Sequence, residues 1–129
     1  MSNEKIHKIL VVDDSKLIHK MYEVMLRPHA LIYALNGREG LQKLGEHADI
    51  DLILLDINMP QINGLEFLGH AKGNPAFAKI PVVIVSTEGK DDDILRGLKA
   101  GAAAYIKKPF QREQLIQVIG RMQAHESAA

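Results

Sequence analysis

The sequence predicts an α/β fold in which helices cover both faces of a parallel sheet. The first observation behind this prediction is that five short apolar runs alternate with five amphipathic stretches along the 129 residues. Such alternation builds parallel strands joined by right-handed crossovers. The second observation is that a run such as Leu52 to Leu55 is apolar throughout, with no polar residue at every second position. Continuous apolar runs of this length are typical of strands buried on both faces.

Five strands are expected where the apolar runs lie. They cover residues 8–12, 30–35, 52–55, 81–86 and 103–106. No repeat, low-complexity tract or interdomain linker separates the runs, and the chain has the length of one ordinary domain. We therefore expect a single domain over residues 1–129, with no output domain.

Helices are expected between the strands, because apolar residues recur there at helical spacing. The expected segments lie around residues 17–25, 37–44, 65–72, 94–98 and 115–122. Pro28 ends the first and Asn36-Gly37 opens the second, while three acids at 91–93 suit the N-terminus of the fourth. The first helix has more apolar residues than one core-facing stripe needs, so part of it could be exposed and dock a kinase or phosphotransfer helix. A core stripe with scattered surface apolar residues is the alternative.

Composition excludes several classes of function. Acids and bases balance at 16 each, so no net charge favours nucleic acid or an anionic membrane. The absence of cysteine removes disulfides, thiolate metal sites and thiol nucleophiles. The N-terminus has no apolar secretory segment and no window is long enough to span a membrane, so a cytoplasmic protein is expected.

The histidines show no paired metal-ligand spacing and none follows an expected strand. We expect all six to be surface or local polar residues away from the functional site: His7, His19, His29, His47, His70 and His125.

Polar side chains gather where the expected strands end. They are Asp13 and Asp14 after the first strand, Asp56 after the third, Ser86 and Thr87 at the fourth, and Lys107 and Lys108 at the fifth. The ligand crevice of an open parallel sheet lies beyond these carboxyl ends, so acids, hydroxyls and an ammonium should converge there. Neighbouring carboxylates repel one another, which favours a bound cation, and magnesium suits all-oxygen ligands. The alternative role of the Asp13-Asp14 pair is that of a helix N-cap. The alternative for Asp56 is an ordinary acid in the turn after a strand.

These residues and their intervals resemble the receiver domain of two-component response regulators, and most of all the stand-alone regulators of the chemotaxis type. The motifs are VVDDS, LLDINMPQINGLEFL, VSTEG and YIKKPF, and the resemblance covers essentially the whole chain. It implies a flavodoxin-like fold with five helices on two faces of a five-stranded parallel sheet in the order 2-1-3-4-5, an order taken from the family. It also implies a phosphoacceptor switch that is not an enzyme beyond its own phosphorylation and dephosphorylation.

The resemblance assigns Asp56 as the phosphoacceptor, which takes a phosphoryl group from a sensor histidine kinase or histidine phosphotransfer protein. It implies Mg²⁺ held directly by Asp14 and Asp56, through water by Asp13, and by the backbone carbonyl of Asn58.

Lys108 and Ser86 would bind the phosphoryl oxygens in this family. Side chains alternate along a strand, so Lys107 should face solvent when Lys108 faces the crevice. The family also has a cis peptide bond at the position of Lys108 and Pro109, which an X-Pro bond permits.

Other positions modulate or transmit in the family. Asn58 and Glu88 flank the phosphoryl pocket and influence hydrolysis, with plain loop polarity as the alternative. Thr87 departs from the usual Ala or Gly and could narrow access to Asp56. Ser86 and Tyr105 would form the switch, which changes the face made by the fourth helix, the last strand and the last helix. A tyrosine exposed on an edge strand is the alternative for Tyr105.

The expected partners are the phosphoryl donor and a protein target, such as a flagellar motor switch component, bound by a monomer. A chemotaxis switch is favoured, and a phosphorelay intermediate or phosphate sink is the alternative. An aspartate-nucleophile phosphatase of the haloacid dehalogenase type is disfavoured, because Asn58 stands where such enzymes need an acid. No nucleotide-binding glycine motif occurs. A degenerate receiver used as a scaffold would lack an acceptor, acid or lysine, and all are present.

Overall fold

The computed structural model describes residues 6–27, 29–57, 64–86, 91–108 and 110–128, of which 86, 91–94 and 123–128 are described by their backbone only. Its strands are β1 (Lys8–Val12), β2 (Ala30–Ala34), β3 (Leu52–Leu55), β4 (Val82–Ser86) and β5 (Ala104–Lys107). They form one parallel sheet in the order β2-β1-β3-β4-β5. The expected fold class and strand order are confirmed.

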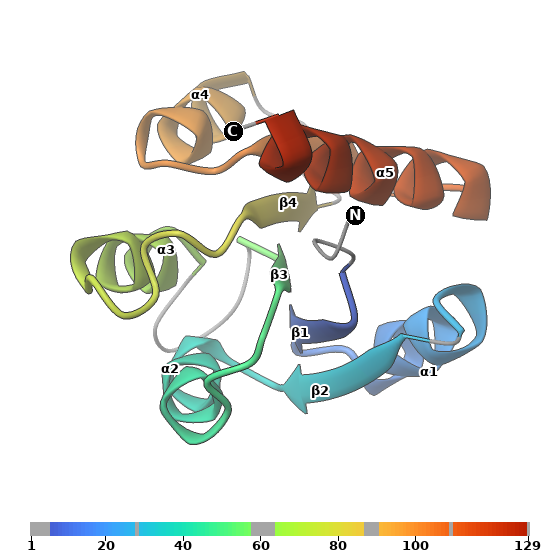
Figure 1. Cartoon of the computed structure of the whole chain (residues 1–129), viewed down its shortest axis with the longest axis horizontal. Coiled ribbons are helices and arrows are strands. Elements are labelled where there is room, and N and C mark those ends of the chain that lie inside the picture. Colours follow the sequence, from blue (N-terminus) through green and yellow to red (C-terminus); the bar gives the residue numbers. More distant parts are fainter. Residues whose placement is uncertain (1–5, 28, 58–63, 87–90, 109, 129) are drawn as a thin grey trace.

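Five helices cover the sheet. They are α1 (Lys16–Met25), α2 (Gly37–Glu46), α3 (Gly64–Gly73), α4 (Asp91–Lys99) and α5 (Arg112–Ala128). Figure 1 shows α1 and α5 on one side of the sheet and α2, α3 and α4 on the other. Helix α5 continues beyond the expected end at residue 122, because residues 123–128 contain neither glycine nor proline to stop it. Among the described residues, no helix has the length and apolarity needed to cross a membrane.

The strands bury both faces, which explains why they are apolar throughout. Alternate residues of β1 enter different clusters: Leu10 and Val12 pack toward α2 and α3, whereas Ile9 and Val11 pack toward α1 and α5. All four side chains have no exposed surface. At about 25 cal/mol for each Å² of apolar surface removed from water, these two cores supply most of the stabilisation of the fold.

Side-chain caps fix where the first two helices begin. The Ser15 hydroxyl accepts a hydrogen bond from the backbone N–H of Ile18 at 3.2 Å, at the start of α1. The Asn36 side chain accepts one from the N–H of Glu39 at 2.9 Å, and the Glu39 carboxylate accepts one from the N–H of Leu35 at 2.8 Å. Both turns leading from strand to helix are therefore held by short polar side chains.

The buried face of helix α1 does not contain all of its apolar residues. Leu17, Val24 and Met21 are 70%, 64% and 36% exposed, whereas His19 and Tyr22 are buried. Part of the apolar surface of this helix is therefore exposed, and its use as a docking surface stays a prediction. The expectation that every histidine is a surface or local polar residue is wrong for His19, which is 8% exposed. It lies on the same helical face as Tyr22 and Leu26, which pack against the sheet.

Candidate functional site

Two acids are held at the carboxyl ends of neighbouring central strands. Asp13 follows β1 and its N–H donates to the carbonyl of Ala34 at 3.0 Å, while the N–H of Asp56, after β3, donates to the carbonyl of Val12 at 2.9 Å. The sheet hydrogen bonding thus continues one residue past each strand. Because β1 and β3 are parallel neighbours, the two carboxylates meet at the same edge of the sheet.

A third acid completes a cluster. Asp13, Asp14 and Asp56 each offer a carboxylate oxygen, and these oxygens all lie within 4.8 Å of one another. Asp13 and Asp56 are only 2% and 8% exposed, whereas Asp14 is exposed. The Asp13 carboxylate also accepts a hydrogen bond from the N–H of Ser15 at 2.9 Å, which fixes its orientation. The cluster therefore has a buried floor and an open side.

Lys108, which follows β5, reaches this cluster from across the sheet. Its Nζ lies 2.7 Å from an oxygen of Asp13 and 3.7 Å from an oxygen of Asp56, and its side chain is 9% exposed. Lys107 is exposed, as strand alternation predicts. The ammonium pairs more closely with Asp13 than with Asp56, a preference that the sequence does not indicate.

Tyr22 of α1 lies beneath the acids. Burial raises the pKa of its phenol far above the usual value of 10, and the negative charges of Asp13 and Asp56 raise it further. Its ring stacks on Phe110, with ring centroids 5.8 Å apart. Tyr22 is therefore neutral at physiological pH and forms an apolar support for the charged groups above it.

His19 is a residue near the site that sequence reasoning missed. Its Nε2 lies 2.7 Å from the backbone carbonyl oxygen of Asp13, and its ring stacks on Tyr33 with centroids 4.7 Å apart. The signal was its position one turn after the Ser15 N-cap, which directs the side chain back toward the end of β1.

The acid cluster fits a divalent cation. Magnesium bonds oxygen at about 2.0–2.1 Å, so opposite ligands of one ion lie about 4 Å apart. The spread of the carboxylate oxygens is only slightly wider, and Asp14 faces the solvent from which an ion would enter. An all-oxygen set is the donor chemistry that magnesium prefers. The three acids could therefore hold an ion after a small inward movement.

The remaining expected site residues are described to different extents. The backbone of Ser86 ends β4 opposite Lys107. Tyr105 of β5 is half-buried and packs against the core cluster on the side of α2 and α3. Asn58, Thr87, Glu88 and Pro109 lie outside the described residues, so the carbonyl ligand, the two flanking positions and the cis peptide bond stay predictions.

Comparison with known proteins agrees with this geometry. The family model of the response regulator receiver domain matches residues 9–120. Chemotaxis protein CheY1 of Helicobacter pylori is 34% identical over 120 residues, which span 88% of this chain and 97% of that protein. The structure of Vibrio cholerae chemotaxis protein CheY4 superposes with a TM-score of 0.84 at 30% identity, covering 91% of this chain and 98% of the other.

A metal-bound relative is also similar. The Mn²⁺-bound form of response regulator Rcp1 has a TM-score of 0.73 at 30% identity, covering 94% of this chain and 92% of that one. The acid triad described above is typical of the metal site of receiver domains, and these domains are signalling switches rather than enzymes. The match over nearly the whole chain, together with the strand order and the acid cluster, shows that this chain belongs to the response regulator receiver domain family.

Proposed function

We propose that the chain is a Mg²⁺-dependent switch in which Asp56 accepts the phosphoryl group. The observation that carries this proposal is the convergence of Asp13, Asp14, Asp56 and Lys108 at one edge of the sheet. Asp56 combines a buried position with an ammonium at 3.7 Å. In the transfer, an Asp56 carboxylate oxygen bonds to phosphorus as the phosphorus–nitrogen bond to the donor histidine breaks, and the nitrogen keeps the electron pair.

The surrounding groups would stabilise the charge that moves. Asp14 and Asp56 would hold Mg²⁺ directly and Asp13 through water, and the ion would neutralise charge on the phosphoryl oxygens. Lys108 would turn from Asp13 toward the new phosphoryl group, a movement that its flexible stem permits. Catalysis in such a transfer is positioning and electrostatics, because the transition state is loose.

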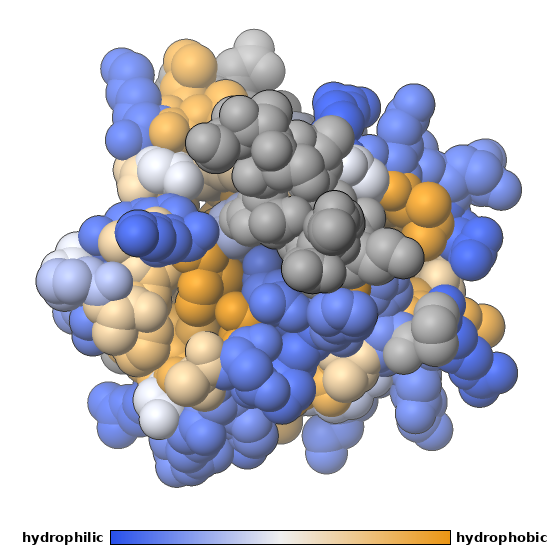
Figure 2. Space-filling view, in the orientation of Figure 1, coloured by the Kyte–Doolittle hydropathy of each residue, from blue (hydrophilic) through white to orange (hydrophobic). Residues whose placement is uncertain are grey.

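The output surface would be the face of α4, β5 and α5. Phosphorylation takes the Asp56 side chain from about −1 to about −2 and adds strong acceptors, which Ser86 would bind and Tyr105 would follow by moving inward. Leu95 and Leu98 of α4 are 52% and 42% exposed, and Figure 2 shows apolar surface at the upper left, where α4 lies. This apolar surface supports binding of a protein target.

Chemotaxis is the proposed setting, because CheY1 of Helicobacter pylori and CheY4 of Vibrio cholerae are chemotaxis proteins matched over nearly their whole length. A relay intermediate is the second candidate. The exposed Leu17, Met21 and Val24 of α1 favour it, since this stripe begins three residues after Asp14 and suits an apolar helix of a histidine phosphotransfer protein.

The phosphoacceptor is tested by incubating the chain with acetyl phosphate and Mg²⁺ and measuring the intact mass. One added phosphoryl group is expected, which should be absent in Asp56→Asn and in the presence of EDTA. Modification that persists in Asp56→Asn would contradict the assignment. Asp51→Asn is a matched control, because Asp51 lies before β3 instead of after it.

The two candidate roles differ in what the phosphorylated chain does next. A switch should bind a flagellar motor peptide more tightly after phosphorylation, and Tyr105→Ala should remove that difference. A relay intermediate should instead return its phosphoryl group to a histidine phosphotransfer protein. This transfer is measured as a loss of mass from the chain when that protein is added.

A further inference from the structure

Among the described residues, strand β2 forms one edge of the sheet and is paired only with β1. The N–H of Ala30 donates to His7 and the carbonyl of Ala34 accepts from Asp13, so the even-numbered residues of β2 direct their backbone groups toward β1. Backbone groups alternate along a strand, so those of Leu31 and Tyr33 point outward. Within the described part of the chain, no second strand or side chain satisfies them.

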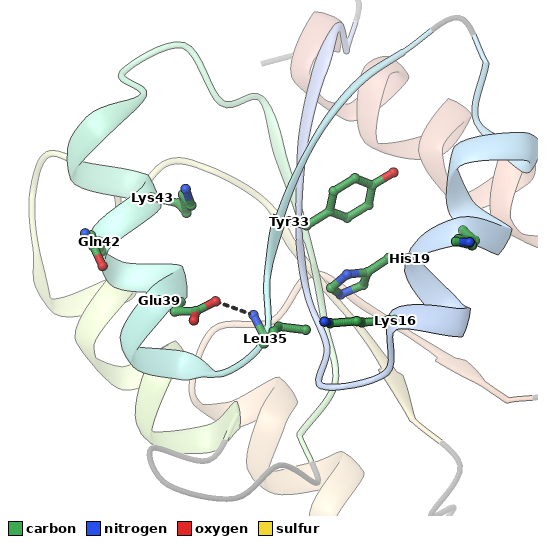
Figure 3. A pocket seen from close by; sticks show the side chains of 8 residues that line it. Lys16, His19, Tyr33, Leu35, Glu39, Gln42 and Lys43 are labelled. Atoms are coloured by element: carbon green, nitrogen blue, oxygen red, sulfur yellow. Dashed lines mark hydrogen bonds between the residues drawn. The ribbon is translucent and has the colours of Figure 1, made fainter.

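The next outward N–H, that of Leu35, is already used. It donates to the Glu39 carboxylate at 2.8 Å, as the dashed line in Figure 3 shows. The open part of the edge is therefore a short segment centred on Leu31 and Tyr33, closed at one end by α2.

Helices α1 and α2 project beyond this edge and make β2 the floor of a groove (Figure 3). One hollow of about 520 Å³ lies between the two helices, over Tyr33 and Leu35. A second, of about 300 Å³, lies beside α1 over Leu31 and shares Tyr33 with the first. We name the two hollows together the β2 groove. Its open, elongated form beside unpaired backbone groups suits an extended chain better than a compact ligand, which needs burial on most sides.

The charge of the β2 groove selects one kind of chain. Its lining has four permanently basic side chains, Lys16, Lys20, Lys43 and Arg27, against two acids, Glu23 and Glu39. Glu39 keeps its negative charge while it accepts the N–H of Leu35, and Lys43 lies 3.8 Å from Glu46, so four basic groups face three acids. The groove is therefore positive, although the chain as a whole has no net charge.

The strand itself has none of the protection common on sheet edges. Its sequence ALIYA contains no charge and no proline, and charges or prolines normally prevent strands from pairing with other chains. The basic side chains stand on the flanking helices instead. A second copy paired through β2 would bring two positive grooves together, so self-association is disfavoured.

We propose that the β2 groove binds an extended acidic segment of a partner protein, which adds to the sheet beside β2. Backbone hydrogen bonds to Leu31 and Tyr33 supply the pairing, and lysines on both helices supply the preference for acidic residues. This surface lies at the opposite edge of the sheet from β5.

The test uses the whole chain and a short fluorescent peptide of alternating glutamate and valine, with the alternating lysine and valine peptide as its control. Only the acidic peptide should raise the anisotropy, with weaker binding at high salt. Amide resonances of Leu31 and Tyr33 should shift and their hydrogen exchange should slow. Equal binding of the lysine peptide, or no binding of the acidic one at millimolar concentration, overturns the proposal.

Two sets of variants locate the binding. Lys20→Glu with Lys43→Glu should weaken it about tenfold, because two exposed attractions become repulsions. Lys79→Glu, an exposed charge outside the groove, should not. Tyr33→Pro removes an outward N–H without breaking a bond to β1 and should abolish binding, whereas Tyr33→Val retains the N–H and should bind.

Three other outcomes would also overturn the proposal. The first is equal weakening by Lys79→Glu. The second is concentration-dependent dimerisation that the acidic peptide does not reverse, since it would show a second copy in the groove. The third is an equal set of amide shifts with inorganic phosphate, which would show an ion site. If Tyr33→Pro is unfolded by circular dichroism, the lysine variants and the amide exchange still decide the question.

Discussion

The pairing of Lys108 with the acid cluster gives a sharp prediction about stability. Its Nζ is 2.7 Å from Asp13 and 3.7 Å from Asp56, and all three side chains are largely buried. We expect Lys108→Met to destabilise the metal-free chain, because it leaves buried carboxylates facing one another without the ammonium. Methionine retains most of the side-chain volume, so the change tests charge more than packing.

The magnitude follows from these distances. At an effective dielectric constant of about 20, the attraction of the ammonium is about 6 kcal/mol to Asp13 and about 4.5 kcal/mol to Asp56. Desolvation of the three charges offsets a large part of this attraction, and breaking a buried pair by removing one partner costs about 3–5 kcal/mol net. Asp13→Asn should cost less, since Lys108 keeps Asp56 as a partner. The double variant should differ from the sum of the single variants by about 2 kcal/mol or more.

The assay is urea unfolding in EDTA, followed by far-ultraviolet circular dichroism, for the parent, both single variants and the double variant. Lys107→Met, on the exposed neighbour, should change the free energy of unfolding by no more than about 0.5 kcal/mol. If Lys108→Met is as mild as this control, or if the two single changes simply add, the charge argument is refuted. With Mg²⁺ at about 100 times its dissociation constant, binding of the ion should raise the free energy of unfolding of the parent chain by about 2.7 kcal/mol.

Three further predictions concern the scaffold, and all are read by urea unfolding. Gly64→Ala should lower the free energy of unfolding by about 3 kcal/mol, because the added Cβ would lie 2.3 Å from the Cα of Ile57. Gly69→Ala, in the same helix, should raise it by up to about 1 kcal/mol, because a Cβ there would have nothing within 4 Å. Because the pKa of Tyr22 is raised in the folded chain, the unfolded chain releases the phenol proton at a lower pH than the folded chain does. The contribution of the protonated phenol to stability is therefore complete below about pH 10 and is lost progressively above it. Tyr22→Phe should remove that part of the slope, and an unchanged slope would contradict it. Asn36→Ala should cost about 1 kcal/mol through the lost cap of α2, and no loss would show that the cap is redundant.

The strands were predictable from the sequence because each apolar run is short and continuous. The bounds of β2, β4 and β5 differ by one residue from the expected ones, and a local contact explains the difference for β2. Leu35 is apolar and was expected in a strand, but its N–H bonds to Glu39, so β2 ends at Ala34. The length of α5 was missed because a polar tail without glycine or proline gives no stop signal.

The site was predictable to the level of which strand ends meet, since parallel topology alone brings Asp13 and Asp56 together. Alternation along β5 also separated Lys108 from Lys107. Distances were not predictable, and neither was the closer pairing of Lys108 with Asp13. The role of His19 was missed because its position one turn after the Ser15 N-cap indicates the direction of the side chain but not the carbonyl that it reaches.

The strand order has a consequence for how the chain is made. β1 lies between β2 and β3, so a ribosome that has released residues up to Leu55 has supplied a complete three-stranded sheet with β1 at its centre. β4 and β5 then join one at a time, each to the edge left by the strand before it. Vectorial synthesis can therefore build this sheet in the order in which the strands emerge, and the last strand to emerge brings the lysine that neutralises the acids laid down first.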